Sequence, residues 1–340
     1  MLGGCEHVFV EGGTDSLPYT AIDAIDAAVF DEPTQEVLLH ARTRTRLAPA
    51  HGRALHLGGD GGDVVLTGPP IYLIDLARRH RYRTLVREAA GLARLRQRPA
   101  STVVGAVLRS ARSSYAAQLR ECADLLDGPE LFEHHGWRRP GIEASLAWFR
   151  LSPAAAWSTR NAVRRVGEQL RVTALQVPEL DADNMALRAV RRHADATRQS
   201  QRLASAWRIA LQAPFFDDPV VTACTRVPVV ERTTVARAKP LLGAALAGIV
   251  PSRVLERRSK GDYSASEYAG LRAAGPLLRR LMTAPRLADL GLIEPGRFQP
   301  VLEAAIAGET SPMGALGDVI ATELWLRAEP VAAAYQWKKG

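Results

Sequence analysis

The sequence predicts an α/β fold in which a small parallel sheet precedes a mainly α-helical region. Two short β-rich segments, 6–11 and 54–57, are each followed by glycines and flank a predicted helix. After Pro70, apolar residues recur at helical spacing over 71–98, 101–126, 153–175 and 181–212, and a last helix is expected over 315–327. We therefore divide the chain into an α/β part over 1–70 and a mainly helical part over 71–340.

The helix between the two predicted strands has a marked start. Asp31 or Glu32 can cap it, Pro33 fits its first turn, and residues 37–39 supply an apolar surface. A strand, a helix and a second strand in this order form a βαβ unit, whose strands are normally parallel and buried. The later helices are separated by Gly/Pro breaks at 127–129 and 139–141.

Composition restricts the class of protein. The chain has 340 residues, of which 47% are hydrophobic, so it can bury a core and is unlike a disordered chain. No apolar run approaches the roughly 20 residues that cross a bilayer, and the first residues lack the features of a signal peptide. We expect a cytoplasmic protein with no membrane partner. Cys5, Cys122 and Cys224 are too sparse for a disulfide framework or a thiolate metal site.

The formal net charge of +8 comes mainly from arginine. Such a charge is typical of some nucleic-acid-binding proteins, but the sequence has no zinc-finger spacing and no aromatic-basic RNA motif. The arginines are spread through predicted helices, where they form solvated faces. We expect no nucleic-acid partner. The alternative to plain solvated faces, less favoured by the sequence, is a basic surface that attracts an anion such as ATP or an acidic peptide.

A glycine-rich loop follows the second predicted strand and reads LGGDGGD over residues 57–63. Ligands of open α/β sheets bind at the carboxyl ends of strands. Glycines let the backbone approach a phosphate closely, and the carboxylates of Asp60 and Asp63 can hold a hard cation such as Mg²⁺. The alternative is a glycine-rich turn with solvated aspartates.

Two later segments carry weaker signals. Residues 213–218 read APFFDD, which by itself predicts a turn and a helix cap. Lys239 begins the run KPLL, and residues 257–263 read RRSKGDY around Lys260. Lysines beside glycine can reach phosphate oxygens, although the same residues are also typical of a basic, solvated loop.

These segments, in this order, resemble the synthetase domain of asparagine synthetases. That family carries a G-[DE]-G-x-D-E loop after a strand, a PF-x-D segment, a K-x-x-L-R helix and an R-x-x-K-x-G loop. Here they read GDGGDVV, PFFDD, KPLLGAAL and RRSKGD, within residues 54–263. The resemblance implies a partial adenine-nucleotide alpha-hydrolase-like (PP-loop) parallel sheet followed by a mostly α-helical region. Residues 1–70 would be the remnant of the ATP-pyrophosphatase core.

Four shorter and less specific stretches of sequence resemble those of actinobacterial lasso-peptide cyclases. They are Asp31-Glu32-Pro33, the run VLTGPP over 65–70, the run KGDYS over 260–264 and the closing ATELWLR over 321–327. This likeness implies adenylation of a side-chain carboxylate of a precursor peptide and attack by the peptide's own N-terminal amine. It also implies a leader-peptide recognition protein and a protease as partners, and ATP and Mg²⁺ as cofactors.

The resemblance also assigns roles to residues. Asp63 corresponds to the aspartate that helps bind Mg²⁺, and Asp60 lies where relatives place a substrate-side acid or tyrosine. Lys260 matches the lysine that steadies developing charge, so Lys260 and Asp60 are the implied catalytic residues. The implied ATP- and pyrophosphate-binding residues are Gly58, Gly59, Gly61, Gly62, Lys239 and Lys260.

The family's first ATP loop, S-G-G-x-D-S, has no clear counterpart. Residues 11–16 read EGGTDS, but residues 17–19 match the segment that relatives carry after that loop, so we expect the chain to be N-terminally truncated. If EGGTDS is nonetheless the loop, Asp15 is a second metal ligand and Gly12 and Gly13 line the pyrophosphate.

Four functions stay open: amide-bond formation, a degenerate paralogue that binds a peptide or partner protein, asparagine synthesis, and a basic helical binding protein unrelated to ATP. The N-terminal catalytic cysteine of glutamine-dependent enzymes is not seen, so asparagine synthesis is the less expected enzymatic activity.

Overall fold

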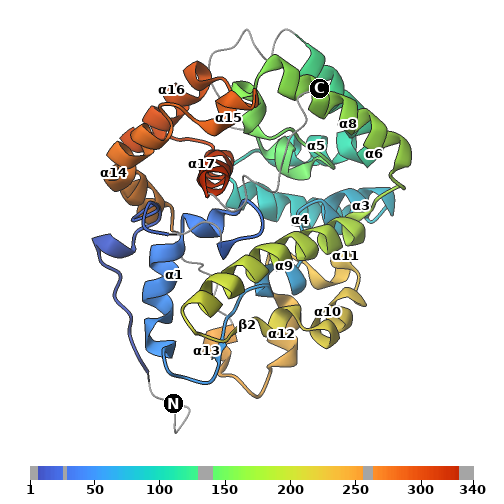
Figure 1. Cartoon of the computed structure of the whole chain (residues 1–340). Coiled ribbons are helices and arrows are strands. Elements are labelled where there is room, and N and C mark those ends of the chain that lie inside the picture. Colours follow the sequence, from blue (N-terminus) through green and yellow to red (C-terminus); the bar gives the residue numbers. More distant parts are fainter. Residues whose placement is uncertain (1–6, 26–28, 129–140, 256–262, 329–340) are drawn as a thin grey trace.

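The computed structural model describes residues 7–25, 29–128, 141–255 and 263–328 (Figure 1). Most of these residues are helical, and one two-stranded sheet joins β1 (His56–Leu57) to β2 (Leu211–Gln212). The strands are parallel, with His56 opposite Leu211. The predicted combination of a small parallel sheet and a mainly helical region is therefore confirmed, while the PP-loop relationship stays a prediction.

The predicted pairing of the strands is wrong. Residues 7–11 form no strand, and the side chain of Phe9 is 95% exposed; Glu6 lies outside the described residues. β1 covers only the end of the predicted 54–57 strand, and Leu57 is 62% exposed rather than buried. A β-rich composition is not enough to make a strand when no neighbouring chain supplies hydrogen bonds. The partner of β1 comes instead from residues far along the chain.

The first predicted helix also begins later than expected. A 3₁₀ turn, η3 (Gln35–Val37), precedes α1 (His40–Leu47), and the side chain of Thr34 caps η3 by accepting a hydrogen bond from the Glu36 amide. Asp31 is not a cap. Its carboxylate accepts a hydrogen bond from Gln199 and pairs with Arg202, both of which belong to α9 (Ala182–Ala206).

The long helical segments are each divided. Segment 71–98 breaks at His80, which has a φ of +56°, and 181–212 ends as a helix at Ala206, so that β2 can form. The remaining helices are α2 (Gly62–Val65), α3 (Tyr72–Arg78), α4 (Tyr82–Leu95), α5 (Ala100–Ala111), α6 (Tyr115–Asp127), α8 (Arg160–Gln176), α10 (Asp218–Thr225), α11 (Val229–Arg232), α12 (Pro240–Ala245), α13 (Ser252–Leu255), α14 (Ser264–Leu281), α15 (Arg286–Asp289), α16 (Pro295–Ala307) and α17 (Met313–Arg327). The 3₁₀ turns are η1 (Thr14–Ser16), η4 (Ala48–Ala50), η5 (Ile142–Leu146), η6 (Pro153–Trp157) and η7 (Pro214–Phe216).

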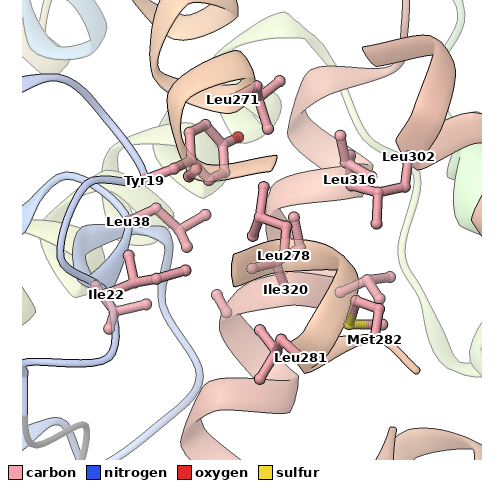
Figure 2. Packing of buried hydrophobic residues seen from close by; sticks show 14 of the residues in the cluster. Tyr19, Ile22, Leu38, Leu271, Leu278, Leu281, Met282, Leu302, Leu316 and Ile320 are labelled. Carbon is pink, nitrogen blue, oxygen red and sulfur yellow. The ribbon is translucent and has the colours of Figure 1, made fainter. Parts of the chain in front are cut away.

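The described residues form two large cores, and α9 contributes residues to both. One joins α14, α16 and α17 to the N-terminal residues Tyr19, Ile22 and Leu38 (Figure 2). The other lies among α3, α4, α5 and α6 and reaches Val229 and Val230 of α11. Residues before 70 thus share a core with the last helices of the chain, and the division at residue 70 stays a prediction. None of the helices in the described ranges is long and apolar enough to span a membrane.

Candidate functional site

The glycine-rich loop connects the end of β1 to α2. The Gly58 amide donates a hydrogen bond of 2.7 Å to the Gln212 carbonyl, which continues the pairing of the two strands into the loop. Gly61, with a φ of +88°, precedes α2 in the left-handed conformation that favours glycine. The loop therefore lies at the carboxyl end of β1, where the sequence predicted a phosphate site.

Phe215 and Phe216 of η7 cover this loop. A Cβ atom on Gly61 would lie 2.7 Å from a ring carbon of Phe216, and one on Gly62 would lie 3.2 Å from a ring carbon of Phe215. The PFFDD segment follows β2 directly, so the parallel pairing of β1 and β2 brings it beside the glycine loop. Its two aromatic rings hold the glycine backbone in place.

Lys239 reaches the same loop from the start of α12. Its Nζ lies 2.9 Å from Oδ1 of Asp63 and 3.3 Å from the position that a Cβ on Gly62 would occupy. The structure thus brings together three of the four predicted segments: the glycine loop, PFFDD and KPLL. The fourth contains Lys260, which lies outside the described residues. Tyr263, which follows it, stacks against the guanidinium of Arg42 at 4.2 Å.

Asp60 is partly buried and faces a carboxylate that the sequence did not single out. Its Oδ2 lies 2.8 Å from the Cβ position of Gly58, so the side chain folds back over its own loop. Burial raises the pKa of Glu36, the nearby charge of Asp60 raises it further, and a 2.6 Å hydrogen bond from Ser200 opposes this. Glu36 therefore holds a proton more readily than an ordinary glutamate. No local motif identifies Glu36, because its neighbours come from distant segments.

The loop and Lys239 fit a nucleoside triphosphate bound together with Mg²⁺. Phosphate oxygens accept hydrogen bonds from groups such as glycine backbone amides and a lysine ammonium, both of which are present here. Mg²⁺ commonly takes one or two protein carboxylates and completes its shell with phosphate and water, so one aspartate can suffice. Within the described ranges, no group of three or more His, Cys, Asp or Glu side chains is arranged to hold a metal ion. Asp63 would therefore hold Mg²⁺, and Lys239 would hold phosphate, only when the nucleotide itself is bound and supplies the other ligands of the metal.

The alternative first loop, EGGTDS, forms the 3₁₀ turn η1. Ser16 closes it by donating from its amide and its hydroxyl to the Gly13 carbonyl, at 3.1 and 2.8 Å. The turn packs against α1 and belongs to no strand. The role of Asp15, Gly12 and Gly13 in binding pyrophosphate stays a prediction.

A buried arginine, Arg232, ties the glycine loop to the segment that leads to Lys239. Its side chain is 1% exposed, and Nη1 donates to the carbonyls of Val65 and Thr67 at 2.6 and 3.3 Å. The next residue, Thr233, accepts a 2.8 Å hydrogen bond from the Gly68 amide. These contacts fix the end of α2 to the chain seven residues before Lys239.

Buried Glu88 of α4 holds the following residues of that segment. Its carboxylate accepts hydrogen bonds from the Val235 amide at 2.8 Å, from the Thr234 hydroxyl and from the Tyr72 hydroxyl at 3.0 Å. These hydrogen bonds outweigh the effect of burial, so the pKa of Glu88 is lowered and the side chain stays ionised. Arg232 and Glu88 together position the backbone that carries Lys239.

Replacing Arg232 with methionine should destabilise the protein by about 2–3 kcal/mol, because the Val65 and Thr67 carbonyls would lose a charged donor in a buried place. The free energy of unfolding in urea measures this loss. Arg226→Met, at an exposed arginine after α10, is the matched control and should change stability little. Equal unfolding midpoints for Arg232→Met and the unmodified chain would contradict the structural role of Arg232.

Comparison with known proteins identifies one family. A family model described as asparagine synthase matches residues 12–327, which include the glycine loop, PFFDD and Lys239. No curated protein and no solved structure shows a significant match to the chain. The matched residues form most of the sequence, so the chain belongs to the asparagine synthase family.

Proposed function

We propose that the chain uses ATP to form an amide bond within a peptide, through an acyl-adenylate, and so closes the macrolactam ring of a lasso peptide. The observation that carries the proposal is the convergence of Gly61, Gly62, Asp63 and Lys239 beneath the rings of Phe215 and Phe216. Family membership supports ATP-dependent amide formation in general. The more specific part of the proposal is that the substrate is a peptide.

The roles of the residues follow from their positions. Lys239 lies where an ammonium can offset the charge that gathers on phosphate as the carboxylate is adenylated. Asp63 would hold Mg²⁺, which acts as a Lewis acid on the phosphate oxygens. Asp60 lies near enough to Glu36 for its charge to raise the pKa of that carboxyl, and its own carboxylate is suited to orient the attacking amine or accept a proton from it. Lys260 keeps its predicted role in both half-reactions.

One of the strings that resemble lasso cyclases lies beside another in the structure, an arrangement consistent with the more specific proposal. The indole nitrogen of Trp325, in the closing helix α17, donates a 3.3 Å hydrogen bond to the Phe30 carbonyl, directly before Asp31-Glu32-Pro33. Gln199 of α9 donates to both Asp31 and Glu32. The proposal includes the partners that the resemblance implies, a precursor peptide, a leader-recognition protein and a protease, and a cytoplasmic location.

The test is to incubate the chain with Mg·ATP and a precursor peptide that carries an acidic residue near a free N-terminus. We expect release of AMP and pyrophosphate, and a peptide product whose mass is lower by one water. An acetylated N-terminus on the same peptide should permit adenylation but prevent ring closure. Peptide binding without AMP release would instead support the degenerate paralogue. In a parallel incubation with Mg·ATP, aspartate and ammonia or glutamine, formation of asparagine would support asparagine synthesis.

A further inference from the structure

A cavity separate from the glycine loop lies among α6, α9, α17 and the segment before η6. Its volume is about 610 Å³, within the range of sites that hold small molecules or peptide side chains. In Figure 1, α17 lies near the centre of the view, with α9 running below it. The residues that matter for its chemistry are Tyr115, Trp148, Phe149, Arg150, Arg188, Arg192 and Asp318.

The aromatic wall of this cavity is fixed in place. Tyr115 and Trp148 are 7% and 1% exposed, and the rings of Tyr115 and Phe149 meet edge to face at 6.0 Å. The Trp148 indole donates to the Ser110 carbonyl at 3.0 Å, and the Phe149 amide donates to the Gln118 side chain at 3.0 Å. The wall is therefore preformed, and of its three rings the half-buried Phe149 offers a ligand the most surface.

Basic residues adjoin this aromatic wall. Arg188 and Arg192 are four residues apart on α9 and so share one face of the helix. Arg188 donates a 3.3 Å hydrogen bond to the Tyr115 hydroxyl and lies 5.1 Å from the centre of its ring. In the part of the chain that the structure describes, neither these two arginines nor Arg150 forms an ion pair with a carboxylate. The single acid in the lining, Asp318, accepts a 2.6 Å hydrogen bond from Gln35.

A second basic cavity shares one lining residue, Arg150, with the first. Its volume is about 730 Å³, and Arg96 and Arg98 add two more cations to its lining, with Ser145, Tyr268 and Thr310 nearby. Among the described residues, the two linings together hold five arginines: Arg96, Arg98, Arg150, Arg188 and Arg192. A peptide segment in which carboxylates alternate with apolar side chains can contact both the arginines and the aromatic rings. A free phosphate can contact only the arginines.

We propose that this pair of cavities binds an acidic segment of the peptide substrate, with one carboxylate held by Arg188 and Arg192 and an adjacent apolar side chain packed on Tyr115 and Phe149. The proposal rests on the proposed function, in that the substrate is a peptide. It places peptide recognition on α9 and the segment before η6, apart from the residues that would hold ATP.

The experiment is fluorescence anisotropy with a fluorescein-labelled hexapeptide of alternating phenylalanine and glutamate, compared with a probe that has glutamine in place of glutamate. Binding is measured without ATP, so its outcome does not depend on catalysis. The acidic probe should bind at least tenfold more tightly than the neutral one, and the double variant Arg188→Gln/Arg192→Gln should lose about tenfold or more of that affinity. The double variant Arg165→Gln/Arg191→Gln removes the same charge from exposed arginines outside the lining and should lose less than twofold.

Three outcomes would overturn the proposal. They are equal losses in the two double variants, equal affinity for the acidic and neutral probes, and displacement of the acidic probe by tripolyphosphate as effectively as by the unlabelled peptide. The last would identify a phosphate site instead. Thermal unfolding of Arg188→Gln/Arg192→Gln should give an unchanged midpoint, which shows that the variant is folded. Failure of the proposed function would appear as absent AMP release while the acidic probe still binds.

Discussion

Substitution of Lys239 by alanine should weaken the binding of Mg·ATP by at least tenfold and reduce AMP release by about a hundredfold. The ammonium lies 2.9 Å from Asp63 and beside Gly62, and its side chain is only 32% exposed. Its removal would take away a positive charge beside the glycine loop and one partner of Asp63. Charge-assisted contacts to developing phosphate charge are among the stronger contributions to catalysis. Isothermal titration calorimetry and an AMP assay measure the two effects.

The charge of Lys239, rather than its backbone, would cause this loss. Lys239 has a φ of +51°, a strained conformation that alanine shares, so the substitution leaves the backbone cost nearly the same. Arg237→Ala, at an exposed residue of the same segment, is the matched control. Asp63→Asn should weaken Mg·ATP binding too, and the double variant should lose less than the sum of the two single losses because the residues contact each other. Unchanged Mg·ATP affinity in Lys239→Ala would remove Lys239 from the site.

Local patterns in the sequence predicted those parts of the molecule that depend on local physics. Helical spacing of apolar residues located the segments that contain α3 to α6, α8, α9 and α17, because one buried face per helix leaves a period in the sequence. The glycine loop and Lys239 were identified by the order of their motifs, and the structure brings them together. Their predicted functions rest on the family and on the experiments above.

The parts that were missed depend on contacts between distant residues. β2 was assigned to a helix, although Ile209, Leu211 and Ala213 are buried alternately, a period of two that indicates a strand. The segment 7–11 has the composition of a strand but no partner in the sheet. Arg232 and Glu36 gain their importance from carbonyls and carboxylates far away in the sequence, which no local pattern records.

Because the rings of Phe215 and Phe216 cover the glycine loop, alanine substitutions at Gly59 and Gly61 should differ greatly in their effects on stability and Mg·ATP binding. Gly61→Ala should destabilise the protein by about 2 kcal/mol or more and abolish detectable Mg·ATP binding. Gly61 has a φ of +88°, which costs a residue with a side chain about 1–2 kcal/mol, and its added Cβ would lie 2.7 Å from the Phe216 ring. Gly59→Ala should be tolerated, since its Cβ would meet no atom within 4 Å. Thermal unfolding and calorimetric titration of Mg·ATP compare the two variants.

A third variant separates the two causes at Gly61. Asparagine adopts the left-handed conformation more readily than alanine, so Gly61→Asn should recover stability relative to Gly61→Ala if backbone strain dominates. If the contact with Phe216 dominates, Gly61→Asn should be at least as destabilised, and Gly61→Ala combined with Phe216→Leu should recover Mg·ATP binding instead. Equal stability and equal Mg·ATP binding for Gly61→Ala and Gly59→Ala would show that Phe216 does not constrain the loop. The rings of PFFDD would then have no part in shaping the nucleotide site, and their position beside the glycines would be a matter of core packing alone.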